Sequence, residues 1–300
     1  MDEITKIETI DQYDQLFGLE TLHPLVNVID FSKATKTVEY YQMNIGFYSL
    51  FLKDAKCGDL RYGRKYYDYQ EGTVVCMAPG QVIGIDNRKK TPQRTKSIGV
   101  LFHPDLIRGT SLGQNIKNYS FFSYEVNEAL HLSEQEKEIV TDCIHKIQIE
   151  LEHAIDKHSK QLIVRNIELL LDYCMRFYER QFITRNQVNK DIIVRFEHLL
   201  DEYFQGQVAL TEGLPSVKYF ADKVCLSPNY FGDLIKKETG KTAQEYIQCR
   251  IIELAKERIL EGSQTVSQIA YELGFQYPQH FSRLFKKHVG YTPNEYKQQN

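Results

Sequence analysis

Apolar and polar positions alternate in two different ways along this chain, and the change falls near residue 130. Residues 20–103 hold short apolar, β-branched or aromatic runs between turns rich in Gly, Pro, Asn and Asp. Runs of this length and composition are typical of strands. The runs cover residues 25–31, 46–52, 72–77 and 97–102. The pattern predicts a small antiparallel barrel or a jelly roll.

Residues 133–182 follow the helical period, with apolar positions at i, i+3 and i+4. Ser133 and Glu136 have the spacing of a capping box, which marks the start of a helix. A second apolar stripe covers residues 162–177, beginning at Leu162. We therefore expect two amphipathic helices, whose apolar stripes either cover the barrel or pair two copies of the chain.

A short polar stretch separates these helices from the last third of the chain. Residues 184–190 are predicted to form a linker, and Asp191 to begin a further helix with its apolar positions turned inward. Residues 207–215 are then predicted to form a loop.

The last third of the chain repeats itself, because residues 216–240 are echoed with one insertion in residues 265–290. Each copy holds two short helical patterns separated by a tight turn. Two copies are too few for a solenoid or a propeller. The matched pairs are Val217 and Val266, Ala221 and Ala270, Val224 and Leu273, Pro228 and Pro278, Phe231 and Phe281, Leu234 and Leu284, Lys236 and Lys286, Lys237 and Lys287, and Gly240 and Gly290. The repeat predicts a duplicated helix-turn-helix.

Each copy also carries start and stop signals for its helices. Thr265 and Gln268 form a capping box. Pro278 stands in the first turn of the second helix, where a missing N–H costs little, and Gly290 ends that helix. The first copy has a serine, a proline and a glycine at the corresponding places.

A linker helix is predicted between the copies. It begins at the capping box of Thr242 and Glu245 and ends at Gly262. Roughly 20 helical residues span about 30 Å, and one turn of B-DNA spans about 34 Å. Such a linker could hold two recognition helices in successive major grooves.

Residues 191–300 resemble the DNA-binding domain of AraC/XylS-type transcriptional regulators. The resemblance is carried by residues 269–275 (IAYELGF), 277–286 (YPQHFSRLFK) and 290–296 (GYTPNEY). It implies that the second helix of each copy enters the major groove. The first copy departs from the family pattern at Gly232 and Asp233, where larger or basic side chains are usual. We therefore expect the first copy to bind DNA more weakly.

The DNA-binding candidates lie on the polar faces of the two second helices. We predict base and phosphate contacts from Asn229, Tyr230, Asp233, Lys236, Lys237, Gln279, His280, Ser282, Arg283 and Lys286. Polar and cationic side chains are what a reader of the major groove requires. The alternative is a solvated protein-interaction module.

The strand-rich segment resembles the cupin-like sensory domain of AraC-type regulators in its order of runs and in its turns at residues 71–73 and 78–81. The resemblance implies control by a ligand or partner. A ligand could be gripped by Arg61, Tyr62, Tyr67 and Tyr69, although half-buried strand tyrosines are the alternative. The basic residues 87–96 are interpreted as an exposed hairpin loop that could also touch DNA or a partner.

Composition narrows the function classes. The net charge of −3 argues against a general polyanion binder, and six cysteines without C-x-x-C spacing indicate free thiols in a reducing compartment. The chain contains no H-x-H pair, so we expect no metal, no other cofactor and no enzymatic activity. A metal-free cupin enzyme with a regulatory tail remains the rival hypothesis. The first residues have no signal-peptide pattern, and a cytoplasmic protein is expected.

Together, these patterns and the two resemblances predict an α+β protein with three parts. They are a cupin-like sensory β-barrel over residues 1–130, a helical dimerisation and connector element over residues 131–183, and a double helix-turn-helix domain over residues 190–300. The predicted function is that of a sequence-specific transcription regulator, an activator, acting as a homodimer. Double-stranded DNA, RNA polymerase and a small-molecule effector are its expected partners.

Overall fold

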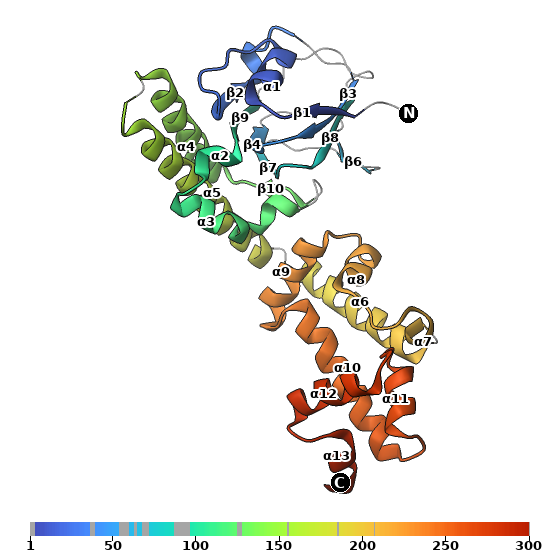
Figure 1. Cartoon of the computed structure of the whole chain (residues 1–300). Coiled ribbons are helices and arrows are strands. Elements are labelled where there is room, and N and C mark those ends of the chain that lie inside the picture. Colours follow the sequence, from blue (N-terminus) through green and yellow to red (C-terminus); the bar gives the residue numbers. More distant parts are fainter. Residues whose placement is uncertain are drawn as a thin grey trace. The chain divides into compact units, whose positions relative to one another are not determined.

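The computed structural model describes residues 4–36, 40–53, 60–62, 65–67, 72–86, 97–124, 128–154, 156–184, 186–206 and 208–299. The chain divides into two compact units, residues 1–184 and residues 185–300 (Figure 1). Both predicted helices between 133 and 182 belong to the first unit. The division of that unit into a sensor and a dimerisation element stays a prediction.

The first unit contains two five-stranded sheets. One has the order β1-β3-β8-β5-β6 and the other the order β10-β7-β4-β9-β2. β1 pairs in parallel with β3, and the other described pairings are antiparallel. The strands are β1 Thr5–Ile7, β2 Val26–Asp30, β3 Tyr40–Ile45, β4 Tyr48–Lys53, β5 Leu60–Tyr62, β6 Lys65–Tyr67, β7 Thr73–Met77, β8 Val82–Asp86, β9 Ser97–Phe102 and β10 Leu130–His131.

Side chains from both sheets form one buried core. Met43 and Ile83 come from the first sheet, whereas Phe51 and Leu101 come from the second. The helix α1, Ile10–Phe17, adds further core side chains, including the fully buried Ile10. The mixed α+β class is therefore confirmed, and the four predicted strand runs correspond to β2, β4, β7 and β9. The cupin-like identity of the sheets stays a prediction.

Two long helices pack on the second sheet of this unit. They are α4, Glu134–Glu152, which packs on β2 and β9, and α5, Ser159–Thr184, which packs on β10. The capping box predicted at Ser133 and Glu136 is confirmed. The shorter helices are α2, Pro104–Ile107, and α3, Ser111–Asn115, with 3₁₀ turns η1 Phe31–Lys33, η2 Ile116–Asn118 and η3 Ser120–Ser123.

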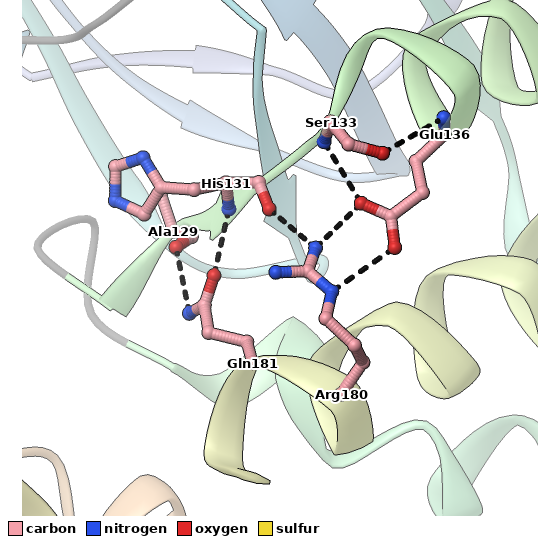
Figure 2. Close-up of polar contacts among 6 residues, drawn as sticks. All are labelled: Ala129, His131, Ser133, Glu136, Arg180 and Gln181. Atoms are coloured by element: carbon pink, nitrogen blue, oxygen red, sulfur yellow. Dashed lines mark hydrogen bonds and ion pairs between the residues drawn. The ribbon is translucent and has the colours of Figure 1, made fainter. Parts of the chain in front are cut away.

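The C-terminal part of α5 is fastened to β10 and to the start of α4 (Figure 2). Arg180 donates from Nε and Nη2 to the two carboxylate oxygens of Glu136, at 3.0 and 2.6 Å, and from Nη2 to the His131 carbonyl at 2.7 Å. Gln181 accepts from the His131 amide at 2.8 Å. Glu136 also accepts from the amide of Ser133 at 2.8 Å. We call Ser133, His131, Glu136, Arg180 and Gln181 the α5 clamp.

The second unit consists of helices joined by short turns, and its described residues contain no strand. Its helices are α6 Asn186–Gln205, α7 Val208–Glu212, α8 Val217–Lys223, α9 Pro228–Thr239, α10 Ala243–Glu261, α11 Val266–Glu272, α12 Pro278–Val289 and α13 Pro293–Gln299. We call α8 with α9 the first helix pair and α11 with α12 the second helix pair. The helix α10 connects them (Figure 1).

Two predictions for this unit are wrong at the level of helix boundaries. The polar stretch from 184 to 190 is not an open linker, because α5 ends at Thr184 and α6 already begins at Asn186. The predicted loop at 207–215 contains α7, whose residue Ala209 is 1% exposed. A five-residue helix shows too little periodicity to be recognised in the sequence.

Candidate nucleic-acid interface

The turn inside each helix pair has the same backbone shape. In the first pair, Cys225 has φ +61° and the next amide donates to the Ala221 carbonyl at 3.0 Å. In the second pair, Gly274 has φ +89° and the next amide donates to the Ala270 carbonyl at 3.0 Å. The predicted tight turns are confirmed. The left-handed conformation of Cys225 has no signal in the sequence, because glycine is the residue that usually marks it.

The helix α9 follows the first turn and is well capped. The Tyr230 amide donates to Ser227 Oγ at 3.2 Å, and Pro228 occupies the first turn. The helix ends at Gly240, which has φ +73°. Its apolar face, with Phe231 the largest side chain, is fully buried.

The opposite, polar face of α9 carries fewer candidate DNA contacts than the sequence suggests. Asn229, Lys236 and Lys237 are exposed, and Asp233 is half-buried. Tyr230 is a correction, since it is 3% exposed and its ring packs inside the unit. Helical spacing predicts that Tyr230 lies beside Asn229 on the polar face, but the residue also borders the buried apolar face of α9.

The helix α12 presents a fuller polar face. Phe281 and Phe285 are fully buried and hold the helix against its unit. Four predicted DNA contacts are exposed to solvent on this helix: Gln279, His280, Arg283 and Lys286. Ser282 is half-buried. The face is cationic and rich in amide and imidazole groups, which suits both phosphates and base edges.

Lysines of both helix pairs lie close to the start of α10. Hydrogen bonds from the backbone and side chain of Thr242 hold the pKa of the Glu245 carboxyl below its usual range, and Lys287 and Lys236 contribute in the same direction. One lysine from each second helix thus acts electrostatically on the first turn of the connecting helix. Lys236, Lys237, Lys286 and Lys287 are all exposed, and exposed cations on the second helices suit contact with the DNA backbone.

The predicted ligand residues of the first unit are only partly described. Arg61 and Tyr62 lie in β5 and Tyr67 lies in β6, but their side chains fall outside the described residues. Tyr69 and the basic segment 87–96 also lie outside the described residues. Their predicted roles stay predictions.

A buried polar group that the sequence did not reveal lies in the core of the first unit. Asp14 of α1 accepts from Thr21 Oγ1 at 2.7 Å and from Asn27 Nδ2 at 2.8 Å, both at Oδ2. Its Oδ1 has no hydrogen-bond partner among the described residues, and the same holds for Ser49 Oγ. Asn27 and Ser49 both pair with Leu101, so they share one row across the second sheet. Burial raises the pKa of the Asp14 carboxyl.

Three of the predicted free thiols, Cys76, Cys143 and Cys174, are buried, and burial raises the pKa of each. Cys225 is exposed, and Cys57 lies outside the described residues. In the part of the chain that the structure describes, no cluster of His, Cys, Asp or Glu is arranged to hold a metal ion. None of the described helices combines the length and apolar character needed to cross a membrane.

Helix pairs with this turn, a buried apolar stripe and a solvent-facing polar second helix define the helix-turn-helix class of DNA-binding proteins. A family model described as a helix-turn-helix domain matches residues 220–299. This match contains α9 and the whole of the second helix pair.

Curated relatives agree with this class. The transcriptional regulatory protein YesN of Bacillus subtilis is 38% identical over 85 residues, which make up 27% of this chain and 23% of YesN. The Tn10 TetD protein of Escherichia coli is 33% identical over 144 residues, 48% of this chain and 91% of TetD. LumQ of Photobacterium leiognathi, a probable transcriptional regulator, is 24% identical over 230 residues, 76% of this chain and 83% of LumQ. The chain belongs to the AraC/XylS-type transcriptional regulators.

Proposed function

We propose that this protein binds specific double-stranded DNA sites through both helix pairs, which read adjacent major grooves. The observation that carries the proposal is the exposed face of α12, where Gln279, His280 and Arg283 project beside a fully buried Phe281. A rigid helix with anchored apolar residues can present amide and guanidinium groups to base edges in a fixed register.

The two helix pairs contribute unequally in this proposal. On α9, Asn229 is the exposed candidate for a base contact, and Lys236 and Lys237 are the phosphate contacts. The half-buried Asp233 stands where α12 has Arg283, and a carboxylate repels phosphate. The second helix pair therefore supplies most of the sequence discrimination.

Two substitutions on α12 test the assignment of roles. Arg283→Ala should lower the affinity for a selected duplex by about 1–3 kcal/mol and relax the preference at one or two base pairs. Lys286→Ala should weaken all sequences alike and reduce the slope of log affinity against log salt by about one. Binding is measured by titration of labelled duplexes, selected from a random library by the full chain, at several salt concentrations.

Lys256→Ala is the matched control, because Lys256 lies on the connecting helix and pairs with Glu253 of the same helix at 2.8 Å. It should bind like the unsubstituted protein. An Arg283→Ala variant that keeps both affinity and base preference would remove Arg283 from the reading face. If the unsubstituted chain selects no sequence at all, the proposed function is wrong.

The first unit is proposed to be the cupin-like sensor. Among the described residues, Asp14 Oδ1 and Ser49 Oγ have no hydrogen-bond partner, and a small effector with hydrogen-bond donors would supply one, because buried polar atoms without partners are costly. By linkage, an effector changes DNA affinity only if it binds one conformation of the protein better than another. The remaining parts of the proposal are contact with RNA polymerase, activation of transcription, and action in the cytoplasm.

A homodimer through α5 is also proposed. Leu162 was predicted to lie on the buried stripe, but it is 44% exposed, and Leu169, seven residues further, is 40% exposed. A spacing of seven brings both leucines to one face of the helix. Large apolar side chains on one exposed stripe indicate an interaction surface.

A further inference from the structure

The helix α6 runs beside the connecting helix α10 and is bridged to it at three levels. Tyr246 Oη donates to Glu197 Oε1 at 2.5 Å. Arg250 donates from Nε and Nη2 to Asp201 Oδ1, at 3.0 and 2.7 Å. The third bridge is a hydrogen bond from Arg258 Nη2 to the carbonyl of Phe204, at 3.2 Å. Residue numbers increase together along both helices, so α6 and α10 lie parallel.

The N-terminal part of α6 is tied to the first helix pair. Asn189 Nδ2 donates to Glu238 of α9 at 3.3 Å. Arg195 Nη2 donates to the Lys223 carbonyl at the end of α8, at 3.1 Å. Because α6 holds both helices of the first pair, any group that fixes α6 to α11 or α12 also fixes the two pairs to each other.

Arg258 is such a group. Its Nη2 binds the Phe204 carbonyl in the last turn of α6, while its Nη1 donates to Glu272 Oε2 of α11 at 3.1 Å. The Glu272 carboxylate also accepts a short hydrogen bond from Gln264, in the loop that leads into α11. The Arg258 side chain is 21% exposed, so water competes weakly for these donors. One guanidinium thus joins three helices.

A second contact nearby ties the same elements at the backbone level. A Cβ added to Gly274, in the turn of the second pair, would lie 2.6 Å from the carbonyl carbon and oxygen of Gly213. Gly213 follows α7, and its carbonyl accepts from Tyr203 Oη of α6 at 2.9 Å. The turn of the second pair therefore rests directly on the segment that α6 holds in place.

We propose that Arg258 is a positioning residue that sets the spacing and angle between the two helix pairs, so that both enter the grooves of one duplex together. This inference rests on the proposed function. It adds specificity for the distance between the two half-sites, which the proposed function leaves undefined. Arg258 lies on the connecting helix, and among the described residues its hydrogen bonds go to Phe204 and Glu272, neither of which is a proposed DNA contact. Its effect on DNA binding is therefore exerted through α6 and α11.

The physical reason is the effective concentration of the second pair once the first pair is bound. A second pair held in a fixed orientation has a high effective concentration at its half-site. A pair that samples many orientations has a lower effective concentration there. Binding to a single half-site involves one pair only and needs no fixed spacing. The role of Arg258 is therefore visible only on duplexes that engage both pairs.

The test uses the full chain and duplexes selected from a random library by the unsubstituted protein. Three duplex types are compared: the full site, the half-site of the second pair alone, and full sites whose half-sites are moved apart or together by one to three base pairs. Arg258→Ala should bind the full site on the order of tenfold more weakly. Its affinity for the half-site should be unchanged, and its dependence on half-site spacing should be flatter.

Two further variants make the result specific. Glu272→Gln keeps an acceptor but removes the charge, and it should show a smaller loss with the same pattern. Lys256→Ala, two residues from Arg258 on the same helix, should match the unsubstituted protein on every duplex.

Equal losses of Arg258→Ala on the full site and the half-site, or an unchanged spacing profile, would overturn the inference, because a merely destabilised unit gives such a result. The half-site measurement also reports whether the variant is folded. If the unsubstituted chain selects no duplex, the proposed function fails; if it selects duplexes with a single half-site, reading by both pairs fails and Arg258 has no spacing to set.

Discussion

Cys225 and Gly274 occupy the same position in the two turns and are held there by different constraints. Cys225 is exposed and has φ +61°, a conformation that costs an L-residue roughly 1–2 kcal/mol. Gly274 has a similar φ of +89° and also faces the Gly213 backbone, where a Cβ would clash at 2.6 Å. The first turn is strained but has room, and the second has no room for a side chain.

Replacing Cys225 by glycine and replacing Gly274 by alanine should therefore have opposite effects on the free energy of unfolding. Cys225→Gly is expected to raise the free energy of unfolding by about 0.5–1 kcal/mol, because the relief of strain exceeds the added chain entropy of glycine. Gly274→Ala is expected to lower it by about 2 kcal/mol or more, since both the backbone and its neighbour must move. Chemical denaturation of the full chain, followed by helical circular dichroism, measures both. A destabilised Cys225→Gly variant would contradict the account of strain.

The buried Asp14 gives the first unit a distinctive response to acid. Burial raises the pKa of its carboxyl above 3.8, so the folded state binds a proton more readily than the unfolded state. This group therefore destabilises the unit most above its folded pKa, and the destabilisation disappears as the pH falls through that pKa towards 3.8.

Asp14→Asn should remove this dependence while keeping an oxygen that accepts from Thr21 and Asn27. We expect the variant to be more stable than the unsubstituted protein at neutral pH, and the difference to shrink on acidification. Thermal unfolding of both proteins across this pH range measures the effect. A difference that does not change with pH would assign the effect to packing instead of proton binding.

Residue-level chemistry explains which sites the sequence revealed. Glycine, proline and capping pairs act over three or four residues, so Gly240, Gly290 and the capping box at Thr265 were correctly predicted. The bridge of Arg258 to Phe204 joins residues 54 positions apart, and no local pattern reports it. Tyr230 was misplaced because helical spacing gives the face of a residue but not the neighbours that cover it.

At the scale of elements, the α5 clamp is a polar contact that holds α5 against β10 and α4 (Figure 2). Arg180→Ala should lower the free energy of unfolding of the first unit by about 2 kcal/mol, because Glu136 loses a charged partner with two hydrogen bonds. Part of the Arg180 side chain, 37%, is exposed, and water limits the loss. Amide hydrogen exchange should show faster opening at β10 and at the start of α4.

Arg176→Ala is the matched control, since Arg176 lies one turn earlier on α5 and is exposed. It should leave exchange at β10 unchanged. Equal effects of the two substitutions would indicate a general loss of helix stability, and the clamp would then have no special part in holding β10.

Elements with strong periodicity or clear caps were predictable, including α4, α5, α9, α10 and α12. The short strands β1 and β10, of three and two residues, were not, because they depend on a neighbouring strand more than on their own sequence. The longer strands β3 and β8 were also missed, whereas β5 and β6 fall in the segment around Tyr62 and Tyr67 that was expected to be strand-like. The early start of α6 at Asn186 was missed for a similar reason: a polar stretch can be helical when its apolar continuation is anchored.

At the scale of the whole molecule, the exposed leucines on α5 would form the interface of the proposed dimer. Leu162→Glu combined with Leu169→Glu should convert a dimer into a monomer, because each charge would face its counterpart across the paired helices. Sedimentation velocity of the full chain measures the change. Leu260→Glu, at a leucine of the second unit that is 51% exposed, is the control and should leave the oligomeric state unchanged. A monomeric unsubstituted protein would contradict the proposed dimer.

Gly232 leaves an open position on α9. It lies in the middle of α9, and a Cβ built there meets no atom within 4 Å. A methyl group can therefore be added at this place without a clash. If α9 reads DNA as proposed, a single substitution at this open position changes the bound sequence while the helix keeps its packing.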